Sequence, residues 1–169
     1  MPDAPDLSSV RFLVLDFDGV MTDNRVLVSQ DGTETVVCNR SDGMGIQLAQ
    51  AAGLDVLVLS KERNPVVRAR CQKIGVPCIQ GQDNKLPVLQ ELVRDRNLEA
   101  RHVAYVGNDA NDIECMDWVG VGIAVADAHR TAMDVADAVT EALGGRGAVR
   151  EVCDLWMEQN GSATDASGD

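Results

Sequence analysis

Short apolar runs alternate with amphipathic stretches along most of this chain, and this alternation limits the possible folds more than any other feature. Runs rich in Val and Leu lie at 11–15, 54–59, 76–80, 102–106, 120–125 and 136–140. Helical patterns lie between them, near 43–52, 64–75, 84–97, 110–118 and 128–136. Strands that alternate with helices at this spacing pair in parallel, and helices cover both faces of the sheet. The sequence therefore predicts an α/β fold with a doubly wound, mostly parallel, Rossmann-like sheet.

One segment interrupts the alternation. Residues 24–39 contain two β-rich runs around Asp31-Gly32, a dipeptide typical of hairpin turns. A two-stranded hairpin is barely stable alone, so it must pack against something. Two interpretations stay open, a surface flap or a contact with a neighbouring subunit. No other insertion leaves room for a second domain, so we expect a small hairpin insertion and no large cap domain.

Length and composition are those of one domain. A chain of 169 residues, 45% of them hydrophobic, buries a sizeable core. Aromatic residues make up only 3%, so we expect a core of Val, Leu, Ile and Ala. We place an N-terminal extension at 1–10, the folded domain at 11–159 and a flexible tail of small polar residues at 160–169.

Charge and cysteine usage narrow the possible partners. A formal net charge of −12 argues against nucleic acid and anionic membranes, which bind basic patches. No apolar stretch reaches the roughly 18 residues of a membrane span, and no signal peptide is recognisable. The five cysteines contain no C-x-x-C pair, which indicates reduced thiols and a cytoplasmic protein. An anionic substrate would therefore need a metal ion and nearby Arg or Lys.

Two acids follow the first predicted strand. Asp16 and Asp18 stand at i and i+2, so they share one side of the chain, and Gly19 ends the strand. In an open α/β sheet, ligands bind beyond the carboxyl ends of the strands. Like charges this close are unfavourable unless a cation lies between them or one of them is protonated. The pair indicates a magnesium-type site in which one carboxylate acts as a nucleophile. The alternative is a pair of turn acids.

Further candidates follow other strands. Ser60 ends the run at 54–59, Lys85 begins a predicted helix, and Asp109 and Asp112 follow the run at 102–106. Each has an ordinary explanation alone, as a turn residue, a surface lysine or a helix cap. Together they converge on the end of the sheet that holds the acid pair. This convergence favours a catalytic site.

Phosphoryl transfer gives these residues complementary roles. Asp16 would attack phosphorus, and Asp18 would protonate the leaving oxygen and then activate water. Ser60 and Lys85 would hold the other phosphate oxygens. Mg²⁺ would bind Asp16, Asp109 and the Asp18 main-chain carbonyl, with support from Asp112.

These residues resemble the haloacid dehalogenase superfamily of phosphohydrolases over about 11–156. The shared motifs are Asp16-Phe-Asp18-Gly-Val-Met-Thr22-Asp23, Ser60, Lys85 and Gly107-Asn-Asp109-Ala-Asn-Asp112. Within it, the chain resembles the capless subfamily that acts on 3-deoxy-octulosonate 8-phosphate and nonulosonate 9-phosphate. Features of this narrower likeness include the hairpin, Arg40-Ser41-Asp42-Gly43 and the segment 144–151. Lys61-Glu62-Arg63 is closer to the branch associated with acylneuraminate cytidylyltransferases than to the octulosonate branch, which has Gly-Arg there.

The resemblance implies a Mg²⁺-dependent phosphomonoesterase for a small phosphorylated sugar acid. It also implies a homotetramer whose hairpins form an interface and enclose the site. The substrate-binding residues that it suggests are Thr22, Asp42, Lys61, Arg63, Asn108 and Arg146. Arg146 would pair with a substrate carboxylate. The glycine-rich segment around it is alternatively a linker with a solvated arginine.

A second class of function stays open. The chain would then be a non-catalytic module, either a phospho-accepting switch or an oligomerisation domain associated with acylneuraminate cytidylyltransferase activity. A receiver-type switch also uses acids at strand ends and a lysine. It needs neither the acid at Asp18 nor the hairpin, so the complete set of residues favours the enzyme.

Overall fold

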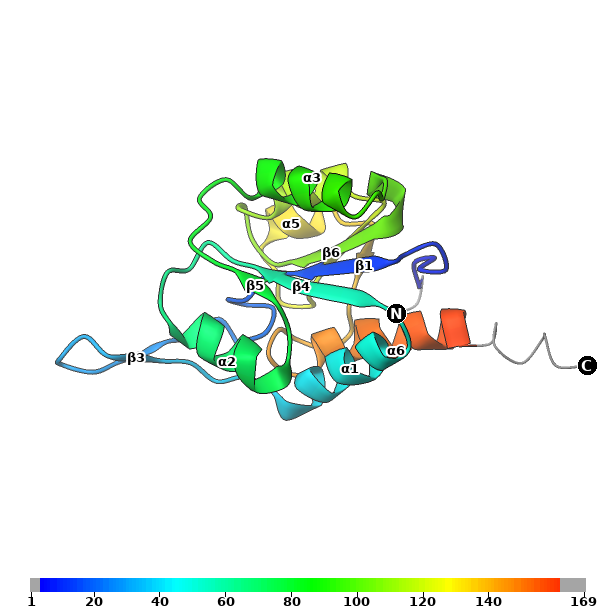
Figure 1. The fold of residues 1–169 in the computed structure, drawn as a ribbon. Helices are drawn as coiled ribbons and strands as arrows, with labels where there is room; N and C mark the ends of the chain where they lie inside the picture. Colours follow the sequence, from blue (N-terminus) through cyan, green and yellow to red (C-terminus); the bar gives the residue numbers. More distant parts are fainter. Residues whose placement is uncertain (1–3, 162–169) are drawn as a thin grey trace, which may run out of the picture.

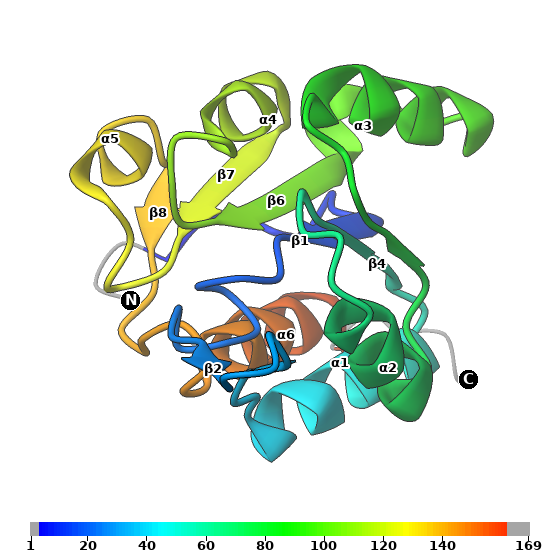
Figure 2. The ribbon, with the colours of Figure 1, turned by 90° about the vertical axis from the view of Figure 1, so that its left-hand side faces the viewer.

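The computed structural model describes residues 4–161, which form three layers with a sheet between two sets of helices (Figures 1 and 2). The sheet has six strands in the order β5-β4-β1-β6-β7-β8, and all neighbouring pairs are parallel. The strands are β1 (Phe12–Leu15), β4 (Asp55–Leu59), β5 (Cys78–Ile79), β6 (Val103–Gly107), β7 (Val121–Ala124) and β8 (Ala138–Val139). The predicted doubly wound, parallel sheet is confirmed.

Helices cover both faces of this sheet. On one face lie α1 (Arg40–Ala51), α2 (Val66–Ile74) and α6 (Ala148–Gly161), below the sheet in Figure 1. The other face carries α3 (Lys85–Asp95), α4 (Ile113–Trp118) and α5 (Arg130–Met133), and a short 3₁₀ turn (Ala100–His102) precedes β6. The core is mainly aliphatic, as the small number of aromatic residues predicted. Within residues 4–161, no helix is both long enough and apolar enough to cross a bilayer.

Helix α6 was absent from the predicted helices. Its buried residues, Ala148, Val149, Val152, Cys153 and Trp156, recur every three to four positions, the spacing of one helical face. The helix packs on α1 and includes Asn160 and Gly161, where we expected the tail to begin. The rest of the predicted tail, 162–169, lies outside the described residues, as do 1–3 of the predicted extension.

The end of α6 also holds the segment that precedes β1. Leu7 and Val10 are buried in the core. The Trp156 indole donates a hydrogen bond to the Val10 carbonyl at 3.0 Å, and the Leu7 amide donates to the Gln159 side chain at 2.6 Å. Residues 7–10 therefore pack as part of the folded unit, next to the last helix.

The hairpin forms as predicted. Strands β2 (Leu27–Val28) and β3 (Glu34–Thr35) are antiparallel, and Gly32 has a φ of 84° in the turn between them. The hairpin extends from the body of the protein on the left of Figure 1. Its apolar side chains are unusually open, because Val26, Leu27 and Val28 are 50%, 68% and 63% exposed. It therefore presents an apolar surface beside the sheet edge where we expect the site.

The connectivity determines where that site lies. From β1 the chain continues through β4 and β5 on one side, then returns to β6 on the other side. Parallel sheets bind ligands in the crevice where the strand order reverses, outside the carboxyl ends of the strands. Here that point lies between the ends of β1 and β6, where Leu15 pairs with Val106. The residues after Leu15 and after Gly107 therefore face each other across a crevice.

Candidate active site

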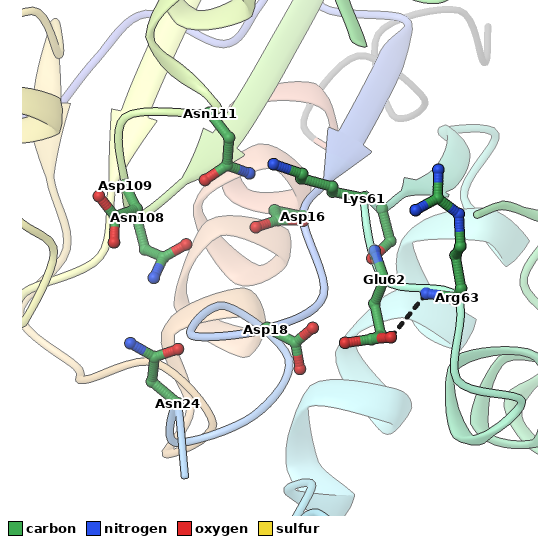
Figure 3. Close-up of a pocket in the computed structure, with 10 residues that line it drawn as sticks. Asp16, Asp18, Asn24, Lys61, Glu62, Arg63, Asn108, Asp109 and Asn111 are labelled. Atoms are coloured by element: carbon green, nitrogen blue, oxygen red, sulfur yellow. Dashed lines mark hydrogen bonds between the residues drawn. The ribbon is translucent and has the colours of Figure 1, made fainter. Parts of the chain in front are cut away.

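A cavity of about 400 Å³ opens at this crevice (Figure 3). Three loops line it, each directly after a strand, and all three strand ends carry residues predicted from the sequence. The lining residues are Asp16, Asp18 and Asn24 after β1, Ser60, Lys61, Glu62 and Arg63 after β4, and Asn108, Asp109 and Asn111 after β6. The predicted convergence of β1, β4 and β6 is therefore present in the structure.

A buried charge cluster, which we call the floor, lies beneath the cavity and consists of Asp16, Lys85, Asp112 and Tyr105. Of these four residues only Asp16 lines the cavity, and the predicted Lys85 lies behind it. The Lys85 ammonium donates to Asp16 Oδ1 at 2.7 Å, to Asp112 Oδ1 at 2.8 Å and to the Tyr105 hydroxyl at 3.2 Å. The Lys85 side chain is only 1% exposed, and those of Asp16 and Asp112 are 6% and 0% exposed. Because an ammonium has three donors, these acceptors use all of them.

Asp112 begins α4 and links the cluster to the loop after β6. Its Oδ2 accepts the backbone amides of Asn108 at 2.9 Å and Asp109 at 3.3 Å, while Oδ1 faces Lys85 and Tyr105. The Asn111 side-chain amide makes a longer contact with Oδ1 at 3.5 Å, so five donors surround this carboxylate. Asp112 does not line the cavity, and its contacts position Lys85 and Asp109 from behind.

Burial and charge adjust the protonation of this floor. Burial raises the pKa of Asp16 to about 7; the Asp112 charge adds to this rise, and Lys85 opposes it. Burial alone lowers the pKa of Lys85, but the two carboxylates more than offset it and the net shift is upward. Lys85 therefore stays an ammonium. A cation beside Asp16 would favour its charged form.

Asp18 lies at the wall of the cavity and is half-buried. Burial raises its pKa, the nearby Glu62 carboxylate raises it further, and Lys85 opposes the shift. A carboxyl group with a raised pKa holds a proton closer to neutral pH than an ordinary aspartate does. This is the property that a general acid in phosphoester cleavage needs.

The loop after β1 is held by a hydroxyl inside the protein. The Thr22 Oγ1 accepts the amides of Gly19 at 3.1 Å and Asn24 at 3.3 Å, and Thr22 is fully buried. Gly19 has a φ of 82°, and a Cβ there would lie 2.0 Å from the Asn108 side-chain nitrogen. The structure thus places Thr22 under the loop rather than in the cavity, and it brings the β1 and β6 loops into direct contact.

Two more predicted substrate-binding residues lie outside the cavity lining. Asp42 is fully buried in α1, where its Oδ1 accepts the Arg150 amide at 2.9 Å, at the start of α6. Arg146 is exposed near Asp23. The pKa of Asp23 is lowered mainly by a hydrogen bond from Arg25, and Arg146 contributes to the same shift. The structure therefore brings neither Asp42 nor Arg146 into the cavity of one chain.

Sequence reasoning missed four residues of the site. Asn24, Glu62 and Asn111 line the cavity, and Tyr105 belongs to the buried charge cluster. Each of the three cavity-lining residues follows a strand and stands within two positions of a residue that was predicted, so proximity to a strand end is the signal that could have found it. Tyr105 gave no such signal, because it lies within a buried strand.

Comparisons with known proteins agree with this geometry. The family profile described as haloacid dehalogenase-like hydrolase matches residues 70–149. The 3-deoxy-D-manno-octulosonate 8-phosphate phosphatase KdsC of Escherichia coli K12 is 39% identical over 161 residues, which cover 95% of this chain and 86% of that protein. The chain belongs to the haloacid dehalogenase-like hydrolase family.

Solved structures of this family agree closely with the fold. The 3-deoxy-D-manno-octulosonate 8-phosphate phosphatase of Moraxella catarrhalis, in complex with magnesium, phosphate and KDO, superposes with a TM-score of 0.89. It is 31% identical, and the match covers 95% of this chain and 94% of that one. The cobalt-bound phosphatase of Haemophilus influenzae has a TM-score of 0.87 at 29% identity, with 96% and 95% coverage.

The residues present fit a divalent cation of the magnesium type. Between residues 4 and 161, no group of three or more His, Cys, Asp or Glu side chains is placed so that it could hold a metal ion. Asp16 and Asp109 nevertheless line one cavity from opposite loops (Figure 3). Mg²⁺ is commonly bound by one or two carboxylates with water and phosphate oxygens rather than by a protein cage. A site with few protein ligands, open to a phosphate, matches that preference.

Proposed function

We propose that this protein is a Mg²⁺-dependent phosphomonoesterase that hydrolyses a small sugar-acid phosphate of the octulosonate 8-phosphate or nonulosonate 9-phosphate type. The observation that carries the proposal is the position of Asp16, which lines the cavity and lies 2.7 Å from the buried Lys85. The likeness to octulosonate phosphatases over 95% of the chain supports the substrate class. No comparison favours a non-catalytic module.

The residues divide the reaction into two steps. Asp16 attacks phosphorus and forms an aspartyl phosphate, while Asp18 donates a proton to the leaving sugar oxygen. Asp18 then takes a proton from the water that hydrolyses the intermediate. Ser60, directly after β4, holds a phosphate oxygen, and Lys85 stabilises the charge that builds on the phosphate as a fixed positive charge behind Asp16.

Mg²⁺, when bound, neutralises carboxylate and phosphoryl charge. Asp16, Asp109 and the Asp18 main-chain carbonyl would hold it, and Asp112 would keep Asp109 in place through the amide contacts of its Oδ2. We expect EDTA to abolish phosphate release and Mg²⁺ to restore it. Asp109→Asn should raise the Mg²⁺ concentration needed for half-maximal activity by at least about tenfold.

Residues of the cavity mouth would recognise the sugar acid. Lys61, Arg63 and Asn108 line the cavity and supply positive charge and an amide to the substrate. Thr22 acts indirectly, through the loop that it holds, and Asp42 does so through the start of α6. Arg146 remains the candidate for a substrate carboxylate, in a site completed by a neighbouring subunit.

A homotetramer in the cytoplasm is the proposed working form. The exposed Val26, Leu27 and Val28 of the hairpin supply the apolar surface that a subunit interface needs. Neighbouring hairpins would enclose a cavity that is otherwise open to water. Sedimentation of the purified protein tests this assembly, and a monomer at micromolar concentration would contradict it.

The decisive experiment measures phosphate release from 4-nitrophenyl phosphate with and without Mg²⁺. Sustained turnover supports the enzyme, whereas stoichiometric labelling of Asp16 without turnover would support a phospho-accepting switch. A panel of octulosonate and nonulosonate phosphates, ranked by kcat/KM, then identifies the substrate. If Arg146→Ala leaves KM for the best substrate unchanged, Arg146 does not bind its carboxylate.

A further inference from the structure

Tyr105 is the only tyrosine of the chain, and it lies at the centre of the fold. It stands in the middle of β6, where all five residues are buried, and it is the largest of the fully buried side chains. Its neighbours in the strand, Ala104 and Val106, are apolar. A hydroxyl in such a position destabilises the fold unless it is hydrogen-bonded, and phenylalanine would fill the same space without one. The hydroxyl group therefore needs an explanation.

That hydroxyl takes part in two hydrogen bonds of the buried charge cluster. It donates to Asp112 Oδ1 at 2.8 Å and accepts from the Lys85 ammonium at 3.2 Å. An ammonium only donates and a carboxylate only accepts, so the direction of both hydrogen bonds is determined. Burial raises the pKa of Tyr105 well above its ordinary value, and the Asp112 and Asp16 charges raise it further. The phenol therefore keeps its proton.

The geometry controls the position of Lys85. The ammonium has acceptors in three directions, and only one of them, Asp16, lines the cavity. Asp112 and Tyr105 hold the lysine from the inner side. Loss of the phenol would leave Asp112 Oδ1 with one donor fewer and Lys85 with one acceptor fewer. The lysine would then be free to shift toward Asp112 and away from Asp16.

We propose that Tyr105 is a positioning residue, which through its hydrogen bonds to Lys85 and Asp112 holds the lysine against the nucleophile Asp16. This inference rests on the proposed phosphatase function and adds a residue to it. The hydroxyl contacts neither substrate nor metal, because Tyr105 is fully buried and does not line the cavity. It acts on the reaction only through the lysine.

The first test is Tyr105→Phe, which removes the hydroxyl and keeps the ring. We expect kcat for 4-nitrophenyl phosphate to fall about tenfold, the loss typical of one buried hydrogen bond to a charged group, while KM changes less than about twofold. The melting temperature checks that the variant is folded. A folded variant with the kcat of the natural protein would overturn the proposal.

A double-mutant cycle separates positioning from simple core filling. If the hydroxyl acts through Asp112 and Lys85, Tyr105→Phe should lower kcat far less in an Asp112→Asn background than in the natural protein. Asp117→Asn, an exposed acid on the same helix α4, is the matched background in which the full effect should persist. Equal effects in both backgrounds would show that Tyr105 acts independently of the cluster.

The single tyrosine permits a third test that does not need activity. Growth on tyrosine labelled with ¹³C at Cζ gives one protein resonance, which reports on hydrogen bonding of that hydroxyl. Asp112→Asn should shift this resonance, and Asp117→Asn should leave it in place. If the natural protein releases no phosphate, the proposed function fails, and the resonance still decides whether the network exists. An unshifted resonance in folded Asp112→Asn would overturn the network itself.

Discussion

In the floor, Lys85 and Asp112 each contact three or more partners, whereas on the rim, by which we mean Lys61, Glu62 and Arg63, the two cations are exposed and have few partners. Lys85 on the floor contacts two carboxylates and a phenol. On the rim, Lys61 has no ion pair within residues 4–161, and the ion pair of Arg63 with Asp83 joins two largely exposed side chains. We infer from this difference that the floor carries out the reaction and that the rim selects the substrate.

The two regions also differ in what change they tolerate. A buried ion cluster loses several kcal/mol when one partner is removed, because the remaining charge is left without compensation. An exposed ion pair contributes only about 0–1 kcal/mol. Substitutions on the rim should therefore change the stability of the fold very little. Substitutions in the floor should destabilise it, because each buried charge there depends on its partners. The predictions below test this contrast, from the largest expected effect to the smallest.

Asp16→Asn should show the largest difference in activity between a change in the floor and a change beside the rim. Removal of the nucleophile should lower kcat by on the order of 10⁴- to 10⁶-fold, the range found when single members of a catalytic triad are removed. Asp83→Asn, at an exposed acid beside the rim, is the control and should retain nearly full activity. Steady-state phosphate release and circular dichroism check both variants. Retained turnover in folded Asp16→Asn would remove Asp16 as the nucleophile.

Gly19→Ala should damage the contact between the two catalytic loops. Gly19 and Gly32 have nearly the same φ, 82° and 84°, but only a Cβ at Gly19 meets another side chain, that of Asn108. Gly32→Ala should lower the free energy of unfolding by about 1–2 kcal/mol through backbone strain. Gly19→Ala should lower it by about 2–5 kcal/mol and reduce kcat as well. Urea unfolding of both variants measures the difference, and equal losses would show that the loops adjust freely.

Glu62→Gln tests whether the rim influences the proton of Asp18. The Glu62 carboxylate raises the pKa of Asp18, second to burial, so its neutralisation should lower that pKa. The first step needs protonated Asp18. The fall of kcat/KM on the alkaline side should therefore move to lower pH in the variant. A pH–rate profile at saturating Mg²⁺ checks the direction of the shift. A move to higher pH would contradict the assignment of Asp18 as the acid.

Lys61→Ala should have the smallest effect, and this effect should be a weaker binding of substrate rather than a slower reaction. Its exposed side chain lines the cavity (Figure 3), and within residues 4–161 no hydrogen bond or ion pair joins its ammonium to the floor. We expect KM for a sugar-acid phosphate to rise several-fold at nearly constant kcat, the pattern of uniform binding lost from both ground and transition states. With 4-nitrophenyl phosphate the change should be smaller. A large fall in kcat would place Lys61 in the reaction and end the contrast between floor and rim.

Much of this site could be predicted because strand ends are encoded locally. Asp16 and Asp18 follow a buried apolar run, Ser60 and Asp109 follow two others, and parallel pairing brings those ends together. The hairpin was equally local, since Asp31-Gly32 determines its turn. In these cases a few consecutive residues are enough to predict a strand end or a turn. The topology of a parallel sheet then predicts that the strand ends lie together.

The residues that escaped prediction depend on distant contacts. Asp42 resembles an ordinary acid in the first turn of α1, but its carboxylate accepts the Arg150 amide, 108 positions away. Tyr105 resembles a core aromatic until its hydroxyl is placed beside Lys85. Helix α6 was overlooked because its apolar pattern follows the glycine-rich segment before Ala148, which suggested a linker. Such roles arise only when the tertiary structure brings the partners together.

The docking of α6 has a consequence for how this protein is made. Of the described elements, α6 is the last to leave the ribosome, yet its Trp156 donates a hydrogen bond to Val10, 146 residues earlier in the chain. It also occupies one face of the sheet beside α1. Until α6 has been synthesised, the growing polypeptide carries an uncovered apolar face that attracts chaperones and other unfinished chains. Stop codons or frameshifts within α6 would therefore be expected to yield insoluble products, even though every residue of the cavity lies upstream of them.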